Sequence, residues 1–279
     1  MKDFKNKVAA ITGASSGIGR ALAVELARHG CNLALASNSN VAGLAETVAM
    51  AEDLGVKVTS QKVDVSQLKQ VRAWAKKVAR EHGGANLVVN NAGVAHAGTV
   101  LGSGYADYEW VMGINYWGVV YGTKEFLPQL IASGDGHIVN VSSVFGLFAQ
   151  PAMSAYNSSK FAVRGFTESL RQELDMARNG VSATCVHPGG VKTNIAVNGR
   201  FSSSVADVTG SDGAKSRDGF ELLLRTTPET AAKAIVAGVR RDARRVLIGI
   251  DAHAGDSMQR LLPSGYQGLV TTAMRLVKR

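Results

Sequence analysis

Apolar positions along the chain fall into short continuous runs separated by longer stretches of helical spacing. The short runs show little alternation of period two, which is typical of parallel strands buried on both faces. They cover Val8–Thr12, Asn32–Ala36, Val56–Lys62, Leu87–Asn90, His137–Val141, Ser182–His187 and Val246–Ile250. The helical stretches cover Gly17–His29, Ala42–Leu54, Leu68–His82, Tyr108–Leu130, Ala155–Arg178 and Pro228–Arg241. This order predicts an α/β fold with a doubly wound parallel sheet of about seven strands, helices on both faces, and a single domain.

Two segments do not follow this alternation of strand and helix patterns. Residues 193–227 are polar and rich in Ser, Gly and Asp, and they are long for a connection, so they form either a functional lid or a disordered insertion. Residues 251–279 place apolar side chains at helical spacing among basic ones. Such a tail either packs on the domain or a partner subunit or lies on a membrane surface, and we favour packing.

Composition and charge exclude several classes of protein. The chain is 46% hydrophobic and 19% charged, and no apolar run reaches the roughly eighteen residues of a membrane span. The first residues lack the apolar core of a signal peptide, so a cytoplasmic protein without an integral membrane segment is expected. Its net charge of +9 is concentrated after Lys233, without a basic patch interleaved with aromatic residues, and predicts no nucleic-acid binding. The cysteines, Cys31 and Cys185, lie at predicted strands as reduced thiols, and no metal site is expected.

A glycine-rich stretch, Thr12-Gly13-Ala14-Ser15-Ser16-Gly17-Ile18-Gly19, connects the first strand to the first helix. Glycines at such a turn let bare backbone approach a pyrophosphate, and the helix N-terminus attracts its charge. The spacing differs from Gly-x-Gly-x-x-Gly, and no lysine follows as a P-loop requires. By itself the stretch is therefore either a phosphate cradle or a plain tight turn.

The sharpest chemical signal is Tyr156-Asn157-Ser158-Ser159-Lys160 at the start of a long helix. Residues four apart share a helix face, so the Lys160 ammonium can approach the Tyr156 hydroxyl and favour the phenolate. Thirteen residues earlier, Ser143 follows a strand end, where open α/β sheets bind ligands. Further small-residue turns at strand ends are Asn90-Asn91-Ala92-Gly93 and His187-Pro188-Gly189.

Together these motifs resemble the short-chain dehydrogenase/reductase family in its ordinary single-domain form. The resemblance runs from about Lys7 to Thr193 and more loosely to Ile250. It implies a Rossmann-type catalytic domain over residues 1–250, with a substrate loop at 193–227. It also implies a set of cofactor-binding residues: Gly13, Ser15, Ser16, Gly17, Ile18, Gly19, Ser37, Asn38, Asp64, Val65, Asn90, Asn91, Ala92, Gly93, Tyr156, Lys160, Pro188, Gly189, Val191 and Thr193.

The family's chemistry is hydride transfer between a nicotinamide cofactor and a carbonyl or alcohol carbon. The resemblance implies that Tyr156 is the general acid or base and that Lys160 lowers its pKa and binds the nicotinamide ribose. Ser143 holds the substrate oxygen, and its thirteen-residue spacing from Tyr156 distinguishes it from Ser142. Asn115 shapes the active-site helix and supports a proton relay.

The choice of cofactor depends on the end of the second strand, where a carboxylate would select NAD. The sequence has Ser37-Asn38-Ser39-Asn40 there and no carboxylate, and it also lacks the family's NADP-selecting arginine at Ser16 and Asn38. We favour NADP(H) over NAD(H), and Arg20 either contributes to this from the first helix or has only a role on the helix face.

The substrate is a small carbonyl or alcohol compound that these motifs do not identify. His96, Phe145, Phe148 and Met153 lie next to the catalytic motifs and either line an apolar pocket or belong to the core. The resemblance also implies a homodimer or homotetramer. The alternatives are a non-catalytic sensor or scaffold that binds the cofactor, or an epimerase or dehydratase.

Overall fold

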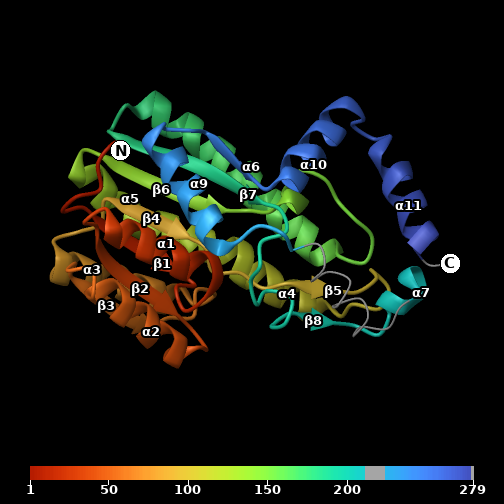
Figure 1. The fold of residues 1–279 in the computed structure, drawn as a ribbon, viewed down its shortest axis with the longest axis horizontal. Coiled ribbons are helices and arrows are strands. Elements are labelled where there is room, and N and C mark those ends of the chain that lie inside the picture. The colour runs from red at the N-terminus through yellow and green to blue at the C-terminus, as the bar shows by residue number, and fades with distance from the viewer. Residues whose placement is uncertain (211–223, 278–279) are drawn as a thin grey trace.

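The computed structural model of the chain describes residues 1–210 and 224–277. Seven parallel strands form the central sheet in the order β3-β2-β1-β4-β6-β7-β9 (Figure 1). They are β1 Val8–Thr12, β2 Asn32–Ser37, β3 Val58–Lys62, β4 Leu87–Asn90, β6 Gly136–Val141, β7 Val181–Pro188 and β9 Arg245–Ile248. The strand order reverses between β1 and β4, so the carboxyl ends of these two strands form the switch point where such sheets bind ligands.

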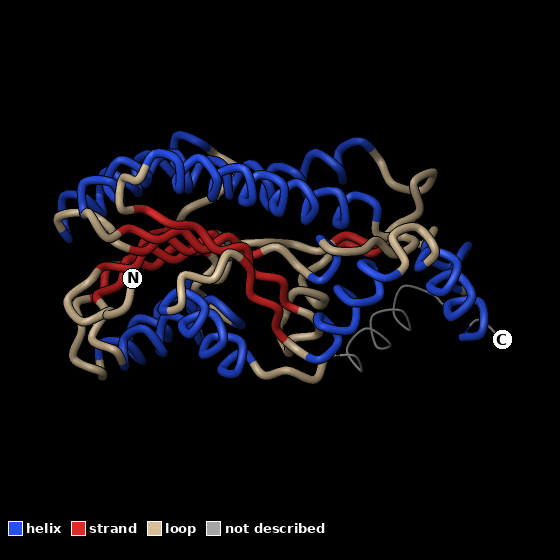
Figure 2. The backbone as a smooth tube through the Cα atoms, turned by 90° about the horizontal axis from the view of Figure 1, so that it is seen from above, coloured by secondary structure: helices blue, strands red, loops and turns tan. Residues whose placement is uncertain are grey.

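Helices cover both faces of this sheet, and Figure 2 shows the strands between two helical layers. One layer contains α1 Gly17–Arg28, α2 Val41–Glu52 and α9 Pro228–Arg240, and the other contains α3 Leu68–His82, α5 Gly118–Ser133 and α6 Ser154–Ala177. The first core includes Leu22, Leu26 and Ile235, and the second includes Trp74 and Phe126, whose rings meet edge to face. The doubly wound single-domain fold is therefore confirmed.

Two expected elements differ in detail. The helix expected at Tyr108–Leu130 is α4 Tyr105–Met112, a π-helical turn at Gly113–Trp117, and then α5. The strand expected at Val246–Ile250 ends at Ile248, because Gly249 has a φ of +95° that turns the chain away from the sheet. Ile250 instead begins α10 Ile250–Leu261 and is 90% exposed.

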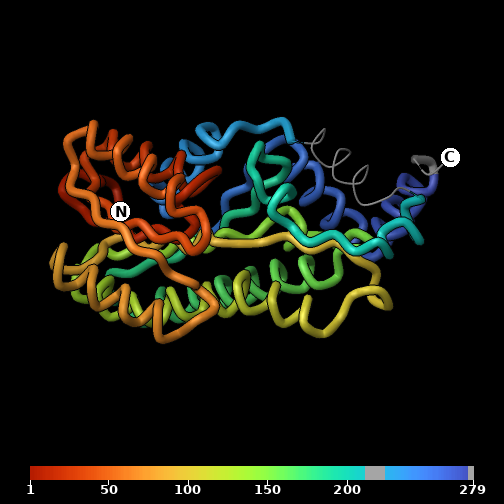
Figure 3. The backbone as a smooth tube through the Cα atoms, turned by 90° about the horizontal axis from the view of Figure 1, so that it is seen from below, coloured from red at the N-terminus to blue at the C-terminus, as the bar shows by residue number. Residues whose placement is uncertain are grey.

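The remaining elements gather at the end of the molecule that lies at the right in Figure 1. The two-residue strands β5 His96–Ala97 and β8 Arg200–Phe201 pair in parallel, and Figure 3 shows the chain after β4 beside the chain after β7. The 3₁₀ turn η2 (Val144–Gly146) and the helices α7 Val205–Thr209 and α11 Tyr266–Val277 complete the elements discussed below. Residues 211–223 of the expected substrate loop and residues 278–279 of the tail lie outside the described residues.

The tail makes specific contacts near its two helix starts. The backbone N–H of Ala149 donates a hydrogen bond to the Tyr266 hydroxyl at 3.2 Å, and the Phe148 and Tyr266 rings pack edge to face. In α10, Ala252, Gly255 and Asp256 are buried. Across residues 1–210 and 224–277, the structure contains no helix with the length and apolarity of a bilayer span.

Candidate active site

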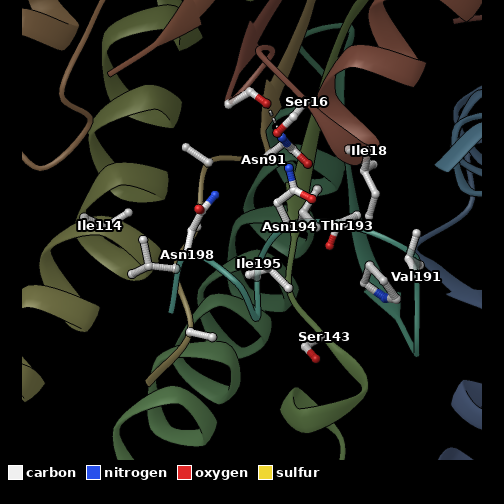
Figure 4. Close-up of a pocket in the computed structure, with 18 of the residues that line it drawn as sticks. Ser16, Ile18, Asn91, Ile114, Ser143, Val191, Thr193, Asn194, Ile195 and Asn198 are labelled. Carbon is white, nitrogen blue, oxygen red and sulfur yellow. Dashed lines mark hydrogen bonds between the residues drawn. The ribbon is translucent and has the colours of Figure 1, made fainter. Parts of the chain in front are cut away.

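A cavity of about 860 Å³ opens at the carboxyl ends of the central strands. Its wall begins at the glycine turn after β1, passes the ends of β2, β4, β6 and β7, and ends at the start of α6. Figure 4 shows the segment Thr193, Asn194 and Ile195 between the glycine turn and Ser143. The volume is at the upper end of the range for small-molecule and cofactor sites.

The glycine turn is held in a conformation that side chains would obstruct. Gly13 and Gly17 have φ values of +65° and +53°, in the left-handed region that favours glycine. A Cβ atom on Gly19 would lie 2.2 Å from the carbonyl oxygen of Gly13, so α1 packs directly against the turn. The turn therefore presents backbone N–H groups at the start of α1, which is the geometry of an anion cradle.

The turns after β1 and β4 are joined by hydrogen bonds between Thr12, Asn91 and Ala92. The Thr12 hydroxyl accepts from the backbone N–H groups of Asn91 and Ala92 at 3.0 and 3.1 Å. The Asn91 amide in turn donates to the carbonyl oxygens of Thr12 and Gly13 at 2.9 and 3.2 Å. This network fixes both turns at the switch point of the sheet.

Ser143, Tyr156 and Lys160 meet at the other end of the cavity and are all buried. The Ser143 hydroxyl lies beside the Tyr156 side chain and accepts a hydrogen bond from the backbone N–H of Phe145 at 3.1 Å, and the Ser143 carbonyl accepts from His187 Nδ1 at 2.9 Å. Lys160 Nζ lies 5.6 Å from the centre of the Tyr156 ring and donates to the Val141 carbonyl at 3.1 Å. A hydroxyl pair thus faces the cavity beside a buried ammonium group.

Burial decides the protonation of these groups. It raises the pKa of Tyr156 to about 12, and the hydrogen bond from Ser143 opposes this change. It lowers the pKa of Lys160 to about 8. Desolvation dominates in this structure, in which the Lys160 ammonium donates to the Val141 carbonyl, so the lowering of the tyrosine pKa by Lys160 stays a prediction. At neutral pH Tyr156 is a neutral phenol that can donate a proton.

Asn115 stands fully buried on the π-helical turn. Its amide oxygen accepts from the Val94 N–H at 2.8 Å, and its amide nitrogen donates to the Val94 carbonyl and the Ser159 hydroxyl at 3.0 Å each. Asn115 therefore connects the segment after β4 to the helix that carries Tyr156 and Lys160. Single turns of π-helix inside longer helices frequently occur at functional sites.

Polar neutral groups line the end of the cavity beside β2. The Ser37 and Ser15 hydroxyls hydrogen-bond each other at 2.9 Å, and Asn38 stands next to them on the wall. Arg20 donates to the carbonyl oxygens of Ser15 and Gly43 and pairs with Glu46 at 2.8 Å. The guanidinium group is thus adjacent to this end of the cavity, but the Glu46 carboxylate already offsets its positive charge.

Most residues expected from the sequence lie on the cavity wall, and three do not: Gly19, Asn90 and Asn115. The Asn90 amide donates to Thr123 and Asn140 inside the fold. Of the apolar candidates, Phe145 and Met153 line the cavity, whereas His96 and Phe148 do not. Wall residues that the sequence reasoning missed include Trp110, Asn194, Ile195, Asn198 and Asp251. Their segments carry no motif, so only the folded chain brings them to the site.

The wall fits an elongated dinucleotide. It offers a glycine cradle for phosphates at its middle, neutral hydrogen-bonding groups beside β2, and a buried ammonium group at the far end. A Cβ atom on Gly17 would meet the Thr193 side chain at 2.9 Å, so the segment after β7 closes over the cradle. The described residues contain no cluster of three or more His, Cys, Asp or Glu side chains that could hold a metal ion.

Comparisons with known proteins agree with this geometry. The family model for short chain dehydrogenases matches residues 7–201. The putative oxidoreductase SadH of Mycobacterium tuberculosis is 50% identical over 275 residues, which cover 98% of this chain and 97% of the relative. A short-chain dehydrogenase/reductase from Burkholderia phymatum, solved with NAD, superposes with a TM-score of 0.86 at 30% identity and covers 96% of this chain and 97% of its own. An alcohol dehydrogenase from Thermococcus sibiricus, solved with 5-hydroxy-NADP, gives a TM-score of 0.72 at 28% identity over 87% and 95% of the chains.

Proposed function

Because the chain belongs to the short-chain dehydrogenase family of oxidoreductases, we propose that it reduces an apolar carbonyl compound with NADPH, or oxidises the corresponding secondary alcohol. The observation that carries this proposal is the convergence of Ser143, Tyr156 and Lys160 at one end of the cavity that also holds the glycine cradle. The bound cofactor would supply or accept a hydride, which the protein's own side chains cannot do.

The protein's own side chains bind the substrate oxygen and supply its proton. The Ser143 and Tyr156 hydroxyls together hold the carbonyl oxygen and polarise it. As the carbonyl carbon gains a hydride, the oxygen gains negative charge, and the Tyr156 O–H proton moves to it to give the alcohol. Lys160 then stabilises the tyrosinate left behind, since its ammonium lies beside the ring. Alcohol oxidation follows the same path in reverse.

The apolar character of the substrate is supported by the wall around the catalytic hydroxyls. Phe145, Met153, Ile195 and Trp110 all line the cavity, and the Phe145 ring packs edge to face with Tyr156. An apolar group next to the carbonyl would replace water against these side chains, which favours binding in proportion to the area covered.

The preference for NADPH is supported by the end of the cavity beside β2. A carboxylate there would repel the additional phosphate of NADP, and Ser37, Asn38 and Ser39 on the wall carry none. The N-terminus of α2, capped by Asn40, adds a favourable dipole for an anion. Arg20 adds a positive charge that Glu46 partly offsets.

The proposed chemistry is tested with Tyr156→Phe. The variant should lose turnover of ketones and alcohols while its dissociation constants for both cofactors stay close to those of the wild type. Undiminished turnover in Tyr156→Phe would contradict the role of Tyr156. A wild-type protein that binds cofactor tightly but turns over no ketone, alcohol or sugar nucleotide would favour the sensor or scaffold alternative.

The cofactor preference is tested by titrating the wild type with NAD and NADP. We expect tighter binding of NADP, and we expect Glu46→Gln to increase that preference because it removes a negative charge beside Arg20. Glu52→Gln is the matched control, since it removes the same charge from an exposed position off the cavity wall. Equal affinities for the two cofactors, or tighter binding of NAD, would overturn the preference.

We further propose that the chain assembles as a dimer or tetramer. Supporting this, large apolar side chains of the helical layer around α6 are exposed to solvent: Trp117 is 47% exposed and Phe161 is 39% exposed. Light scattering at micromolar concentration should give at least twice the monomer mass, and a monomer mass would contradict the assembly.

A further inference from the structure

The carboxylate of Asp251 lies in a cradle made by three glycines. Its Oδ2 atom accepts a hydrogen bond from the backbone N–H of Gly190 at 2.5 Å. A Cβ atom on Gly189 would lie 2.2 Å from both carboxylate oxygens, and one on Gly249 would lie 2.4 Å from Oδ1. Only bare backbone at these positions leaves room for the carboxylate. The contacts bring the start of α10 against the segment that follows β7.

Asp251 faces this segment without a cationic partner. It lines the cavity, yet in the described part of the chain it forms no ion pair, and Arg245 and Arg260, which flank it in sequence, pair with Asp256 instead. A carboxylate in the first turn of a helix stabilises that helix, which alone would explain an aspartate here. It does not explain why two glycines bring the charge onto the cavity wall.

We propose that Asp251 is a specificity-determining residue that favours the oxidised form of the nicotinamide cofactor over the reduced form, and so favours carbonyl reduction at this site. The inference rests on the proposed function and on the family resemblance, which implies that Pro188 and Gly189 would lie beside the nicotinamide ring of the bound cofactor. The ring is a cation when oxidised and neutral when reduced. A fixed negative charge on the adjoining wall attracts only the oxidised form.

A preference for the oxidised cofactor agrees with the proton donor at the catalytic end of the cavity, since both favour carbonyl reduction. Hydride transfer to a carbonyl breaks a C–H bond of the reduced ring, forms one at the carbonyl carbon, and leaves the ring with a positive charge. Asp251 stabilises that product state, while Tyr156 supplies the proton from its hydroxyl. Because a ligand shifts an equilibrium only through its differential affinity for two states, the effect is measurable by binding alone.

The test compares the dissociation constants of oxidised and reduced cofactor in the wild type, Asp251→Asn and Asp251→Ala. Quenching of tryptophan fluorescence reports both forms, since Trp110 lines the cavity. Asp251→Asn keeps an oxygen acceptor for Gly190 and removes only the charge. We expect it to weaken binding of the oxidised form about threefold or more, a modest factor because Asp251 is an exposed residue, with little change for the reduced form. Salt should reduce the difference.

Asp53→Asn is the control for a general loss of negative charge, because Asp53 is exposed at the C-terminal cap of α2 and lies off the cavity wall. In Asp53→Asn, the ratio of the affinities for oxidised and reduced cofactor should equal that of the wild type. If Asp251→Asn leaves the ratio unchanged, or weakens both forms equally, Asp251 only anchors the segment after β7 and the inference fails. If the wild type binds neither form, the proposed function itself fails.

Discussion

The hydroxyl of Ser142 donates a hydrogen bond to the carbonyl oxygen of Lys160 at 2.8 Å. This bond connects the end of β6 to the first turns of α6, although Ser142 also lines the cavity beside Ser143. The hydroxyl of its neighbour Ser143 takes no part in this bond and acts on Tyr156 instead. Ser143 therefore meets Tyr156, and adjacent serines have separate tasks.

Alanine replacements of the two serines should separate these tasks. Ser143→Ala removes the second hydroxyl that holds the substrate oxygen, so kcat/KM should fall by about a hundredfold or more, typical of losing one preorganised donor, with little change in melting temperature. Ser142→Ala leaves the buried Lys160 carbonyl without this donor and should destabilise the fold by about 1–3 kcal/mol. Steady-state kinetics and denaturant unfolding of both variants measure the two effects. A stability loss confined to Ser143→Ala, together with an activity loss confined to Ser142→Ala, would contradict the geometry.

The role of Asn115 is tested by Asn115→Ala. The change removes three hydrogen bonds and leaves both backbone groups of Val94 without their amide partner, so unfolding free energy should fall by about 2–4 kcal/mol. Turnover should fall as well, because Ser159 and the helix around it lose their connection to the segment after β4. Asn157→Ala is the matched control, since among the described residues its amide makes a single hydrogen bond, to the Gln150 carbonyl. Equal stability losses in both variants would contradict the proposed link.

The sequence predicted the parts of the site that depend on local geometry. Tyr156 and Lys160 share a helix face because they are four residues apart, and the turns after β1 and β4 meet because carboxyl ends of parallel strands meet at one edge. The side-chain directions of Asn90 and Asn91 were not predictable. A strand buried on both faces has no polar alternation to indicate which side faces the cavity.

Features of the site that depend on contacts between distant parts of the chain could not be predicted from the sequence, for physical reasons. Asp251 reaches the cavity because Gly249 adopts a positive φ and redirects the chain, and glycine alone does not signal its conformation. The β5–β8 pair spans two residues per strand, too short for any periodicity. The high pKa of Tyr156 results from burial, which spacing along a helix does not report.

Because two histidines are buried, we expect the protein to lose stability in mild acid. Burial lowers the pKa values of His137 and His187 to about 4 each, below the unfolded value near 6.5. The unfolded chain therefore binds protons more readily, and stability falls as pH decreases from about 6.5 to 4, by about 3 kcal/mol for each histidine. Denaturant unfolding across this range measures the slope. His137→Gln should reduce it, and a pH-independent unfolding free energy would contradict both assignments.

Replacing Gly19 by alanine tests the glycine cradle directly. The new Cβ atom would lie 2.2 Å from the Gly13 carbonyl and 2.6 Å from the Asn91 amide, so α1 must shift and the backbone N–H groups lose their common direction. Affinity for both nicotinamide cofactors should fall by about tenfold or more, since each 1.4 kcal/mol lost is a factor of ten. Gly165→Ala is the control: it has open space around its Cβ position inside α6 and should stabilise the fold by about 0.5–1 kcal/mol with unchanged cofactor affinity. Wild-type cofactor affinity in Gly19→Ala would mean that the turn does not carry the phosphates.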